Sequence, residues 1–244
     1  MGFLSVLSFA HKLAQERVLP GDTVVDATVG GGVDTLFLAG LVGEGGRVYG
    51  FDVQREALDK TAARLAAANI GCAVDYSGST KPDRGVAMNG EKPEHAGVGL
   101  NDEAQPRGST TIVERFADPA HGGIHPRVLL VQRSHAEMAK TLHEQSHGNV
   151  AAVMFNLGYL PGFDQTVITT PESTLPALEA AFFLLRRGGI ATIVVYPGHE
   201  GGDTEAAAVH NWASKLPGSA AQTVIYRMIN RSDNAPYLIA VEKR

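Results

Sequence analysis

Residues 23–35 have the sequence TVVDATVGGGVDT, from which the architecture of the chain can be worked out. Residues 23–27 are mostly apolar and partly β-branched, as expected of a short buried strand, and residues 33–42 have the apolar character of a packed helix. Three consecutive glycines, Gly30 to Gly32, allow a ligand to approach the backbone where helix N–H groups are free. The stretch therefore predicts a strand, a ligand-binding loop and a helix.

The same alternation of strand and helix continues along the chain. The other strand-like segments are residues 47–52, 127–132, 149–156, 190–196, 222–229 and 237–242. The other helix-like segments are residues 5–17, 54–69, 170–187 and 203–215, with one more beginning near Ser134. This order predicts an α/β fold: an open, mostly parallel sheet of seven strands, with helices on both faces and one antiparallel strand at the C-terminal end.

Ligands of such sheets bind at the carboxyl ends of the strands, and here the switch point should lie beside the first strand. Asp52 ends the second strand-like segment, about 20 residues after the glycine loop. A carboxylate at that place can accept hydrogen bonds from both hydroxyls of a ribose. Loop and carboxylate together predict a cofactor that contains a nucleoside; the alternative is a simple glycine turn with an Asp that caps a helix.

The residues around the loop favour S-adenosylmethionine over a dinucleotide. A dinucleotide fingerprint that starts at Gly30 needs Gly or Ala where this chain has Thr35. Asp26 ends the first strand, and its charge would repel a pyrophosphate but suits the ammonium group of a methionine moiety. A nicotinamide-dependent oxidoreductase is therefore the weaker alternative.

A second chemical motif, FNLGYLPG, occupies residues 155–162 after the fourth strand-like segment. The Asn156 side-chain oxygen and the Leu157 carbonyl could accept two hydrogen bonds from an amine and aim its lone pair, and Tyr159 could stack on a base. The motif resembles the Asn-Pro-Pro-Tyr element of amino-group methyltransferases, with Leu-Gly in place of Pro-Pro. The alternative is an ordinary strand-to-loop turn with a packed tyrosine.

Longer motifs resemble a bacterial family formerly described as rRNA methylases, whose members are understood as tRNA methyltransferases acting on 5-aminomethyl-2-thiouridine at the wobble position. The motifs are DATVG at residues 26–30, G-x-D-T ending at Thr35, GFDVQ at 50–54, Ser134-His135, FNLGYLPG at 155–162, YPGHEG at 196–201 and AVEKR at 240–244. The resemblance covers residues 1–71 and 127–244. Gly31 departs from the family pattern, which has Asn, so only a backbone contact can carry over there.

The resemblance implies that Gly31, Asp34, Asp52, Gln54, Ser134 and His135 surround S-adenosylmethionine. The full set that we expect to bind the cofactor adds Asp26, Thr28, Gly30, Gly32, Thr35 and Asn156. For His135, the alternative is a residue that merely starts a helix. His199 follows the fifth strand and has three open roles: proton acceptor, wall of a uridine pocket, or helix cap. The expected catalytic residues are Asn156, Leu157, Tyr159 and His199.

The expected function is methylation of the exocyclic amine of the modified wobble uridine, with the anticodon stem-loop of tRNA as the partner. An alkylamine resembles Lys, with a reference pKa of about 10, so it must lose a proton before it attacks. A water molecule or His199 would accept this proton. Alternatives are an rRNA site, an adenine amine in RNA or DNA, and a non-catalytic RNA-binding protein.

Residues 75–126 stand apart in composition. They contain 8 Gly and 5 Pro among 52 residues and show no helical or alternating period. We therefore expect a flexible insertion within a single domain spanning residues 1–244. The insertion has 5 basic and 8 acidic residues, which leaves the rest of the chain nearly neutral. His121 and His125 inside it could in principle bind a metal, but the only thiol, Cys72, is distant in sequence and no other ligands converge, so no metal site is predicted.

Composition narrows the remaining classes of function. The net charge of −5 argues against a protein that coats nucleic acid, and the single Cys72 excludes a disulfide framework. Without a long apolar run or a secretory signal, the chain is expected to be cytoplasmic and not bound to a membrane. An apolar amino-terminal helix and the family resemblance make a homodimer worth testing. The residues near the C-terminus that could contact RNA, unless they are only solvated, are Arg227, Arg231, Lys243, Arg244, Tyr226 and Tyr237.

Overall fold

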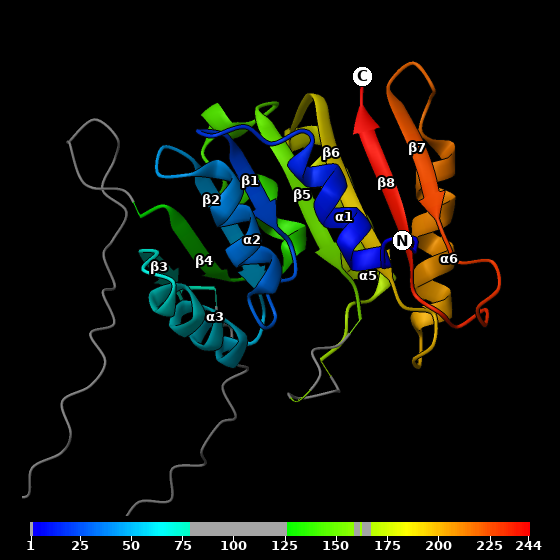
Figure 1. Ribbon diagram of the computed structural model, residues 1–244, viewed down its shortest axis with the longest axis horizontal. Helices are drawn as coiled ribbons and strands as arrows, with labels where there is room; N and C mark the ends of the chain where they lie inside the picture. The colour runs from blue at the N-terminus through cyan, green and yellow to red at the C-terminus, as the bar shows by residue number, and fades with distance from the viewer. Residues whose placement is uncertain (1, 79–125, 159–161, 163–166) are drawn as a thin grey trace, which may run out of the picture.

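The computed structural model describes residues 2–78, 126–158, 162 and 167–244. The strands are β1 (Thr23–Asp26), β2 (Arg47–Asp52), β3 (Cys72–Asp75), β4 (Val128–Gln132), β5 (Val150–Asn156), β6 (Leu185–Val195), β7 (Ala221–Tyr226) and β8 (Tyr237–Lys243). They form one sheet in the order β3-β4-β2-β1-β5-β6-β8-β7 (Figure 1). Only β8 runs against its neighbours β6 and β7 within the described sheet. This confirms the predicted α/β class with one antiparallel strand near the C-terminus.

The predicted number of seven strands is wrong, because the described residues form eight. The additional strand is β3, which pairs in parallel with β4 at the edge of the sheet. It has four residues, of which only Ala73 is buried, so it lacks the apolar run that marks the inner strands. Most of the predicted insertion, residues 79–125 with His121 and His125, lies outside the described residues.

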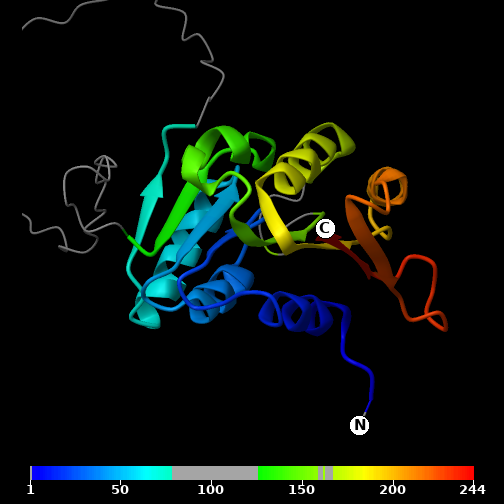
Figure 2. The same ribbon diagram turned by 90° about the horizontal axis from the view of Figure 1, so that it is seen from above.

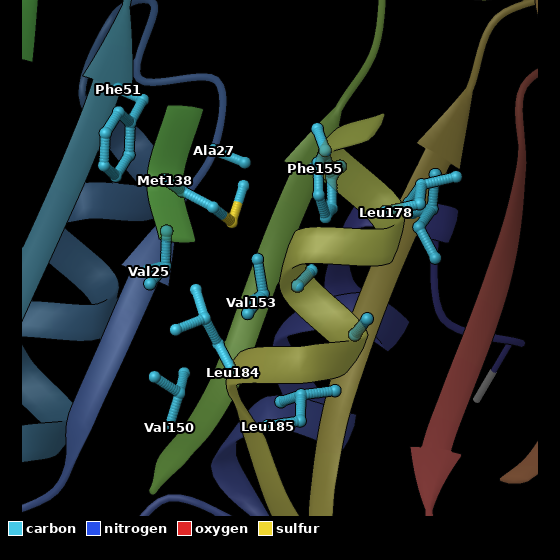
Figure 3. Packing of buried hydrophobic residues seen from close by; sticks show 14 of the residues in the cluster. Val25, Ala27, Phe51, Met138, Val150, Val153, Phe155, Leu178, Leu184 and Leu185 are labelled. Atoms are coloured by element: carbon cyan, nitrogen blue, oxygen red, sulfur yellow. The ribbon is translucent and has the colours of Figure 1, made fainter. Parts of the chain in front are cut away.

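Helices cover both faces of the sheet (Figure 2). One face carries α1 (Val6–Gln15), α2 (Val33–Val42) and α3 (Arg55–Ala67); the other carries α4 (Met138–Thr141), α5 (Pro171–Leu184) and α6 (Gly202–Lys215). Short 3-10 turns at His135–Glu137 and Glu144–Ser146 flank α4. Val24 packs with the first group and Val25 with the second, as the alternating sides of a strand require. Figure 3 shows the core beneath α4 and α5.

The boundary between α5 and β6 differs from the expectation that a helix reaches Arg187. The helix begins at Pro171 after Thr170, as predicted, but it ends at Leu184, and β6 starts at Leu185. The pairing of β6 with β5 shifts register around Gly188 and Gly189, where Gly188 has a φ of +74°. A Cβ at Gly189 would lie 2.9 Å from the Val150 carbonyl oxygen. The two glycines therefore form an irregularity within a strand and do not terminate a helix.

The sheet brings the predicted motifs to one edge. β1 lies between β2 and β5, so the order in which successive strands join the sheet reverses at β1. Such a switch point is where a ligand site is expected. Asp26 pairs with Gly50 of β2 and with Met154 of β5. The loops that follow β1, β2 and β5 therefore begin side by side. In the described part of the chain, none of the helices has the length and apolarity needed to span a bilayer.

Candidate active site

A cavity of about 850 Å³ opens at this carboxyl edge of the sheet. The loops after β1, β2, β4, β5 and β6 form its wall, together with α1 and the loop between β7 and β8. The predicted residues that line it are Thr28, Gly30, Gly31, Asp34, Asp52, Gln54, Ser134, His135, Asn156, Leu157 and His199. Asp26, Gly32 and Thr35 are not among the lining residues, and Tyr159 lies outside the described residues.

The glycine loop after β1 is packed tightly against β2 and α3. Gly30 has a φ of +49°, and its N–H donates to Asp52 Oδ2 at 2.9 Å. Gly32 has a φ of +75°, and a Cβ there would lie 2.5 Å from Thr61 Oγ1. Gly31 differs: its φ is not positive, and a Cβ would meet nothing within 4 Å. The loop thus requires glycine at positions 30 and 32, but position 31 has space for a side chain.

Asp52 connects the glycine loop to the end of β2. Its Oδ1 accepts a hydrogen bond from the Gln54 N–H at 2.8 Å, while Oδ2 holds Gly30. Burial raises the pKa of Asp52, and the backbone donors at Gln54 and Gly30 oppose this shift. A carboxylate has about four acceptor positions, so the backbone donors at Gln54, Gly30 and Val53 do not exhaust it. Asp52 lines the cavity.

Asp26 is fully buried behind the cavity wall. Its carboxylate accepts the Thr35 hydroxyl at 2.6 Å and the Thr28 N–H at 3.1 Å. Burial, followed by the charge of Asp34, raises the pKa of Asp26 to about 7. The predicted contact of Asp26 with an ammonium group stays a prediction, and the carboxylate does not line the cavity. The Thr35 hydroxyl and the loop backbone turn the carboxylate inward, where it supports the loop.

Asp34 and His11 form a pair that sequence reasoning missed. His11 of α1 lies with its Nε2 2.6 Å from Asp34 Oδ1 in the first turn of α2, and both line the cavity. The imidazole stacks on Phe37 at a ring distance of 4.0 Å. Nothing in the helical pattern of residues 5–17 marks His11, because its partner is 23 residues away and meets it only through packing of α1 beside α2.

His135 lies at the end of β4 and is buried. Its Nδ1 is 3.2 Å from the Ala27 carbonyl oxygen, which can only accept, so the tautomer with hydrogen on Nδ1 fits this contact. Burial lowers the pKa of His135 to about 4, which leaves the ring neutral near pH 7. Its Nε2 is buried and has no hydrogen-bond partner among the described residues. Neighbouring Ser134 accepts the Ala136 N–H and also lines the cavity.

Asn156 ends β5 on the other side of the glycine loop. Its N–H donates to Thr28 Oγ1 at 2.7 Å, which joins the loops after β1 and β5. Its Oδ1 is buried without a hydrogen-bond partner in the described chain. Tyr196 is a second residue that sequence reasoning did not place in the site: burial raises the pKa of Tyr196, and a hydrogen bond with the Asn156 side chain opposes the shift. Both residues line the cavity.

His199 packs against the loop that begins at Asn156. A Cβ at Gly158, where φ is +112°, would lie 3.2 Å from His199 Nε2. The other ring nitrogen, Nδ1, lies 2.9 Å from the Glu200 carbonyl oxygen. His199 therefore lines the cavity beside Gly158. In this position it could accept a proton or form the wall of a pocket, and the geometry leaves both roles open.

The six aromatic and basic candidates for RNA contact lie away from the cavity wall. Lys243 donates to the carbonyls of Phe182 and Leu185, each at 2.8 Å, and so caps the end of α5. Arg244 binds the Gly218 carbonyl, Arg227 binds Asp233, and the Tyr226 hydroxyl donates to the Leu4 carbonyl. Arg231 is exposed and Tyr237 half-buried. Lys243 in particular is already engaged in hydrogen bonds to backbone carbonyls within the protein.

The cavity contains nothing in its described walls that resembles a metal centre. Among the residues described, no group of three or more His, Cys, Asp or Glu side chains could hold a metal ion. The wall combines carboxylates at Asp34 and Asp52 with neutral groups at Asn156, Leu157 and Tyr196. Such a site can bind a polar nucleoside at one end and orient a small nucleophile at the other.

Known proteins with related sequences and structures identify the family. Residues 110–242 match the family model described as "Putative rRNA methylase". The chain is 32% identical over 240 residues to an Arabidopsis thaliana protein named "tRNA (mnm(5)s(2)U34)-methyltransferase, chloroplastic", covering 96% of this chain and 68% of that protein.

Two crystal structures resemble the whole chain. One, described as a "putative rRNA-methylase" from Clostridium thermocellum, has 32% identity and a TM-score of 0.73, with 100% of both chains covered. The other, described as a "putative methyltransferase" from Streptococcus mutans in complex with SAH, has 26% identity and a TM-score of 0.70, again over 100% of both chains. The family model covers more than half of the chain, and the Arabidopsis relative matches nearly all of it. The chain therefore belongs to the methyltransferase family described as "Putative rRNA methylase".

Proposed function

We propose that this protein methylates the exocyclic amine of 5-aminomethyl-2-thiouridine at the wobble position of tRNA, with S-adenosylmethionine as the methyl donor. One observation carries the proposal: a single cavity joins a glycine loop and the Asp52 carboxylate to the buried, unpartnered Oδ1 of Asn156. The glycine loop and the Asp52 carboxylate suit a nucleoside cofactor, and the Asn156 Oδ1 suits an amine. The name of the Arabidopsis relative supports the same substrate.

The cavity fits S-adenosylmethionine in the groups that it presents. Asp52 would hold the ribose hydroxyls, and the Gly31 backbone would approach the methionine moiety. Ser134 and His135 would contact the adenine, where the buried Nε2 of His135 still needs a donor. Asp34, held by His11, presents a carboxylate to the cavity and would bind the ammonium group in place of Asp26. When bound, the cofactor supplies an electrophilic methyl group on a sulfonium.

The acceptor end would select and aim a neutral amine. The Asn156 Oδ1 and the Leu157 carbonyl would each accept one N–H, which leaves the nitrogen lone pair directed at the methyl group. An alkylamine has a reference pKa of about 10, so it arrives mostly as an ammonium ion and must lose a proton. His199 beside Gly158, or a water molecule, would take it. Tyr159 would stack on the base.

The tRNA would enter through its anticodon stem-loop, because the unpaired bases of a loop can be splayed out into a cavity, whereas a paired base must first be flipped out of its duplex. The chain would act as one domain built on the sheet. The predicted homodimer, the cytoplasmic location and the role of residues 75–126 stay predictions.

Methyl transfer to purified nucleic acids tests this proposal directly. The protein would be incubated with S-adenosylmethionine labelled in the methyl group and, in separate reactions, with bulk tRNA, rRNA or DNA from a strain that lacks the gene. We expect label in tRNA alone. Label in rRNA would favour the function in the family's description, label in DNA would favour an adenine amine, and no label in any of them would refute a methyltransferase acting on nucleic acid.

A further inference from the structure

A buried carboxylate outside the cavity holds the acceptor loop, residues 157–158 and 167–170 after β5, from behind. Glu205 belongs to the first turns of α6 and has only 3% of its surface exposed. Its Oε2 accepts the Thr169 hydroxyl at 2.8 Å, and its Oε1 accepts the Thr174 hydroxyl at 2.6 Å. Glu205 does not line the cavity, whereas Thr169 does. The position near the helix N-terminus favours a negative charge, and the two hydroxyl donors offset part of the cost of burial.

Thr169 pairs twice with Gly158, where the chain leaves β5. The Gly158 N–H donates to Thr169 Oγ1 at 2.7 Å, and the Thr169 N–H donates to the Gly158 carbonyl at 3.1 Å. Thr169 therefore closes the loop at its two ends. It acts on the peptide unit immediately after Leu157.

This pairing determines where the Leu157 carbonyl points. The Leu157 C=O and the Gly158 N–H belong to the same planar peptide unit and point in opposite directions. When Thr169 Oγ1 holds the N–H, the rotation of that plane is fixed, and so is the direction of the carbonyl. On the other side of the unit, the Leu157 N–H donates to the Val194 carbonyl at 3.0 Å. Both neighbouring peptide planes are thus anchored.

Glu205 in turn fixes the hydroxyl of Thr169. A hydroxyl can rotate and offer either its hydrogen or a lone pair to a neighbour. A carboxylate only accepts, so the Thr169 hydrogen must point to Glu205 and a lone pair remains for the Gly158 N–H. Removing the carboxylate would free the hydroxyl to rotate and weaken its hold on Gly158.

We propose that Glu205 is a positioning residue, which acts through Thr169 to aim the Leu157 carbonyl at the methyl-accepting amine. The inference rests on the proposed function, because it assigns the carbonyl to the amine. Glu205 touches neither the cofactor nor the amine. It therefore affects turnover and leaves cofactor binding unchanged.

Four variants test this chain of contacts. Thr169→Val keeps the shape but removes the hydroxyl, Thr169→Ser restores a hydroxyl, and Glu205→Gln removes the charge that orients it. Asp203→Asn is the matched control, since it removes an exposed carboxylate from the same first turn of α6, where Asp203 bonds only Thr204 in the contacts described. For each we would measure kcat and KM with tRNA from the deletion strain, and Kd for S-adenosylmethionine by calorimetry.

We expect kcat to fall about 10- to 100-fold in Thr169→Val, the loss that a displaced positioning group typically causes. The kcat of Glu205→Gln should also fall, but by less. The kcat of Thr169→Ser should stay within about threefold of wild type because serine keeps the hydroxyl contact, and that of Asp203→Asn should do so because Asp203 does not take part in the contact. Cofactor Kd should not change. If Thr169→Val does not fold, Glu205→Gln against Asp203→Asn provides the same comparison.

Three results would overturn the inference while the proposed function stands: wild-type kcat in both Thr169→Val and Glu205→Gln, equal losses of kcat and cofactor affinity, or no rescue by Thr169→Ser. A wild-type protein that transfers no methyl group to this tRNA would instead refute the proposed function, and the inference would fall with it.

Discussion

The two loops that meet in the cavity are held in different ways. The cofactor loop, residues 27–32 after β1, is held by Asp26 beside it and by residues of β2, α3 and β5, namely Asp52, Thr61 and Asn156. The acceptor loop, residues 157–158 and 167–170, is held by Val194 of β6 and by Glu205 of α6. Both loops therefore depend on tertiary contacts, but those contacts come from different elements, and only the acceptor loop requires the packing of α6.

The two loops also present different chemistry to the cavity. The walls on the cofactor side include the carboxylates of Asp34 and Asp52, while those on the acceptor side are neutral, with Asn156, Thr169 and Tyr196. A negative wall stabilises a positively charged cofactor. A neutral wall provides no such stabilisation for an ammonium ion and therefore favours the neutral amine that can attack.

The largest expected effect concerns the buried carboxyl of Asp26, which immediately precedes the cofactor loop. Burial raises the pKa of Asp26 to about 7, so between pH 3.8 and 7 the folded state holds a proton that the unfolded state has released. Stability is therefore lost as pH rises through this window, by up to about 4 kcal/mol at pH 7. Asp26→Asn should remove the penalty and still accept the Thr28 N–H.

Urea unfolding at pH 4 and pH 7 measures this difference. Relative to wild type, Asp26→Asn should be more stable at pH 7 than at pH 4. An equal difference from wild type at both pH values would show that Asp26 does not titrate in this window.

On the acceptor side, Asn156→Ala should lower kcat about 100- to 1000-fold, the usual cost of removing a pre-aligned group from a reaction site. Cofactor Kd should change little, because the Asn156 N–H that binds Thr28 remains. Steady-state kinetics and calorimetry separate the two effects. Asn149→Ala, at an exposed residue, serves as the control. Full turnover in Asn156→Ala with normal cofactor binding would disprove its role in aiming the amine.

On the cofactor side, Asp52→Ala should show the opposite pattern. Loss of hydrogen bonds to a charged group costs about 1.5–3 kcal/mol, so Kd for S-adenosylmethionine should rise roughly 10- to 100-fold. Turnover at saturating cofactor should fall much less. Asp59→Ala on α3, whose partners in the structure include Tyr76, is the matched control. A loss of kcat without a change in Kd would contradict the assignment of Asp52 to the ribose.

The smallest effect separates two adjacent glycines. Gly32→Ala should destabilise the protein by about 1–3 kcal/mol, because φ is positive and the new Cβ would overlap Thr61. Gly31→Ala should stay within about 0.5 kcal/mol, since its Cβ enters open space. Gly31→Asn, which restores the residue of the family pattern, should also fold. Equal destabilisation at both positions in thermal or urea unfolding would contradict this account of the loop.

The fold and half of the site could be predicted because their signals are local. Apolar runs mark β1, β2, β4, β5 and much of β6, and strand ends place Asp52 and Asn156 at one edge. β3 was missed because an edge strand of four residues needs little apolar surface. The orientation of Asp26 could not be predicted because a carboxylate at a strand end can turn either way, and here the Thr35 hydroxyl and the Thr28 N–H decide it.

Other residues of the site depend on contacts that no sequence pattern encodes. His11, Thr169 and Glu205 reach their partners across 23, 11 and 36 residues, through packing of α1 and α6 against the sheet. Their residue types are common on ordinary helices and loops. Residues on both sides of the cavity are therefore placed only by the tertiary structure.

Mass spectrometry of nucleosides tests the central claim most directly. Transfer RNA from a strain that lacks the gene would be treated with the purified protein and S-adenosylmethionine, digested, and compared with untreated tRNA. We predict that 5-aminomethyl-2-thiouridine disappears and that 5-methylaminomethyl-2-thiouridine replaces it, with no other nucleoside changed. A wobble uridine that keeps its free amine while the cofactor is bound would contradict the account.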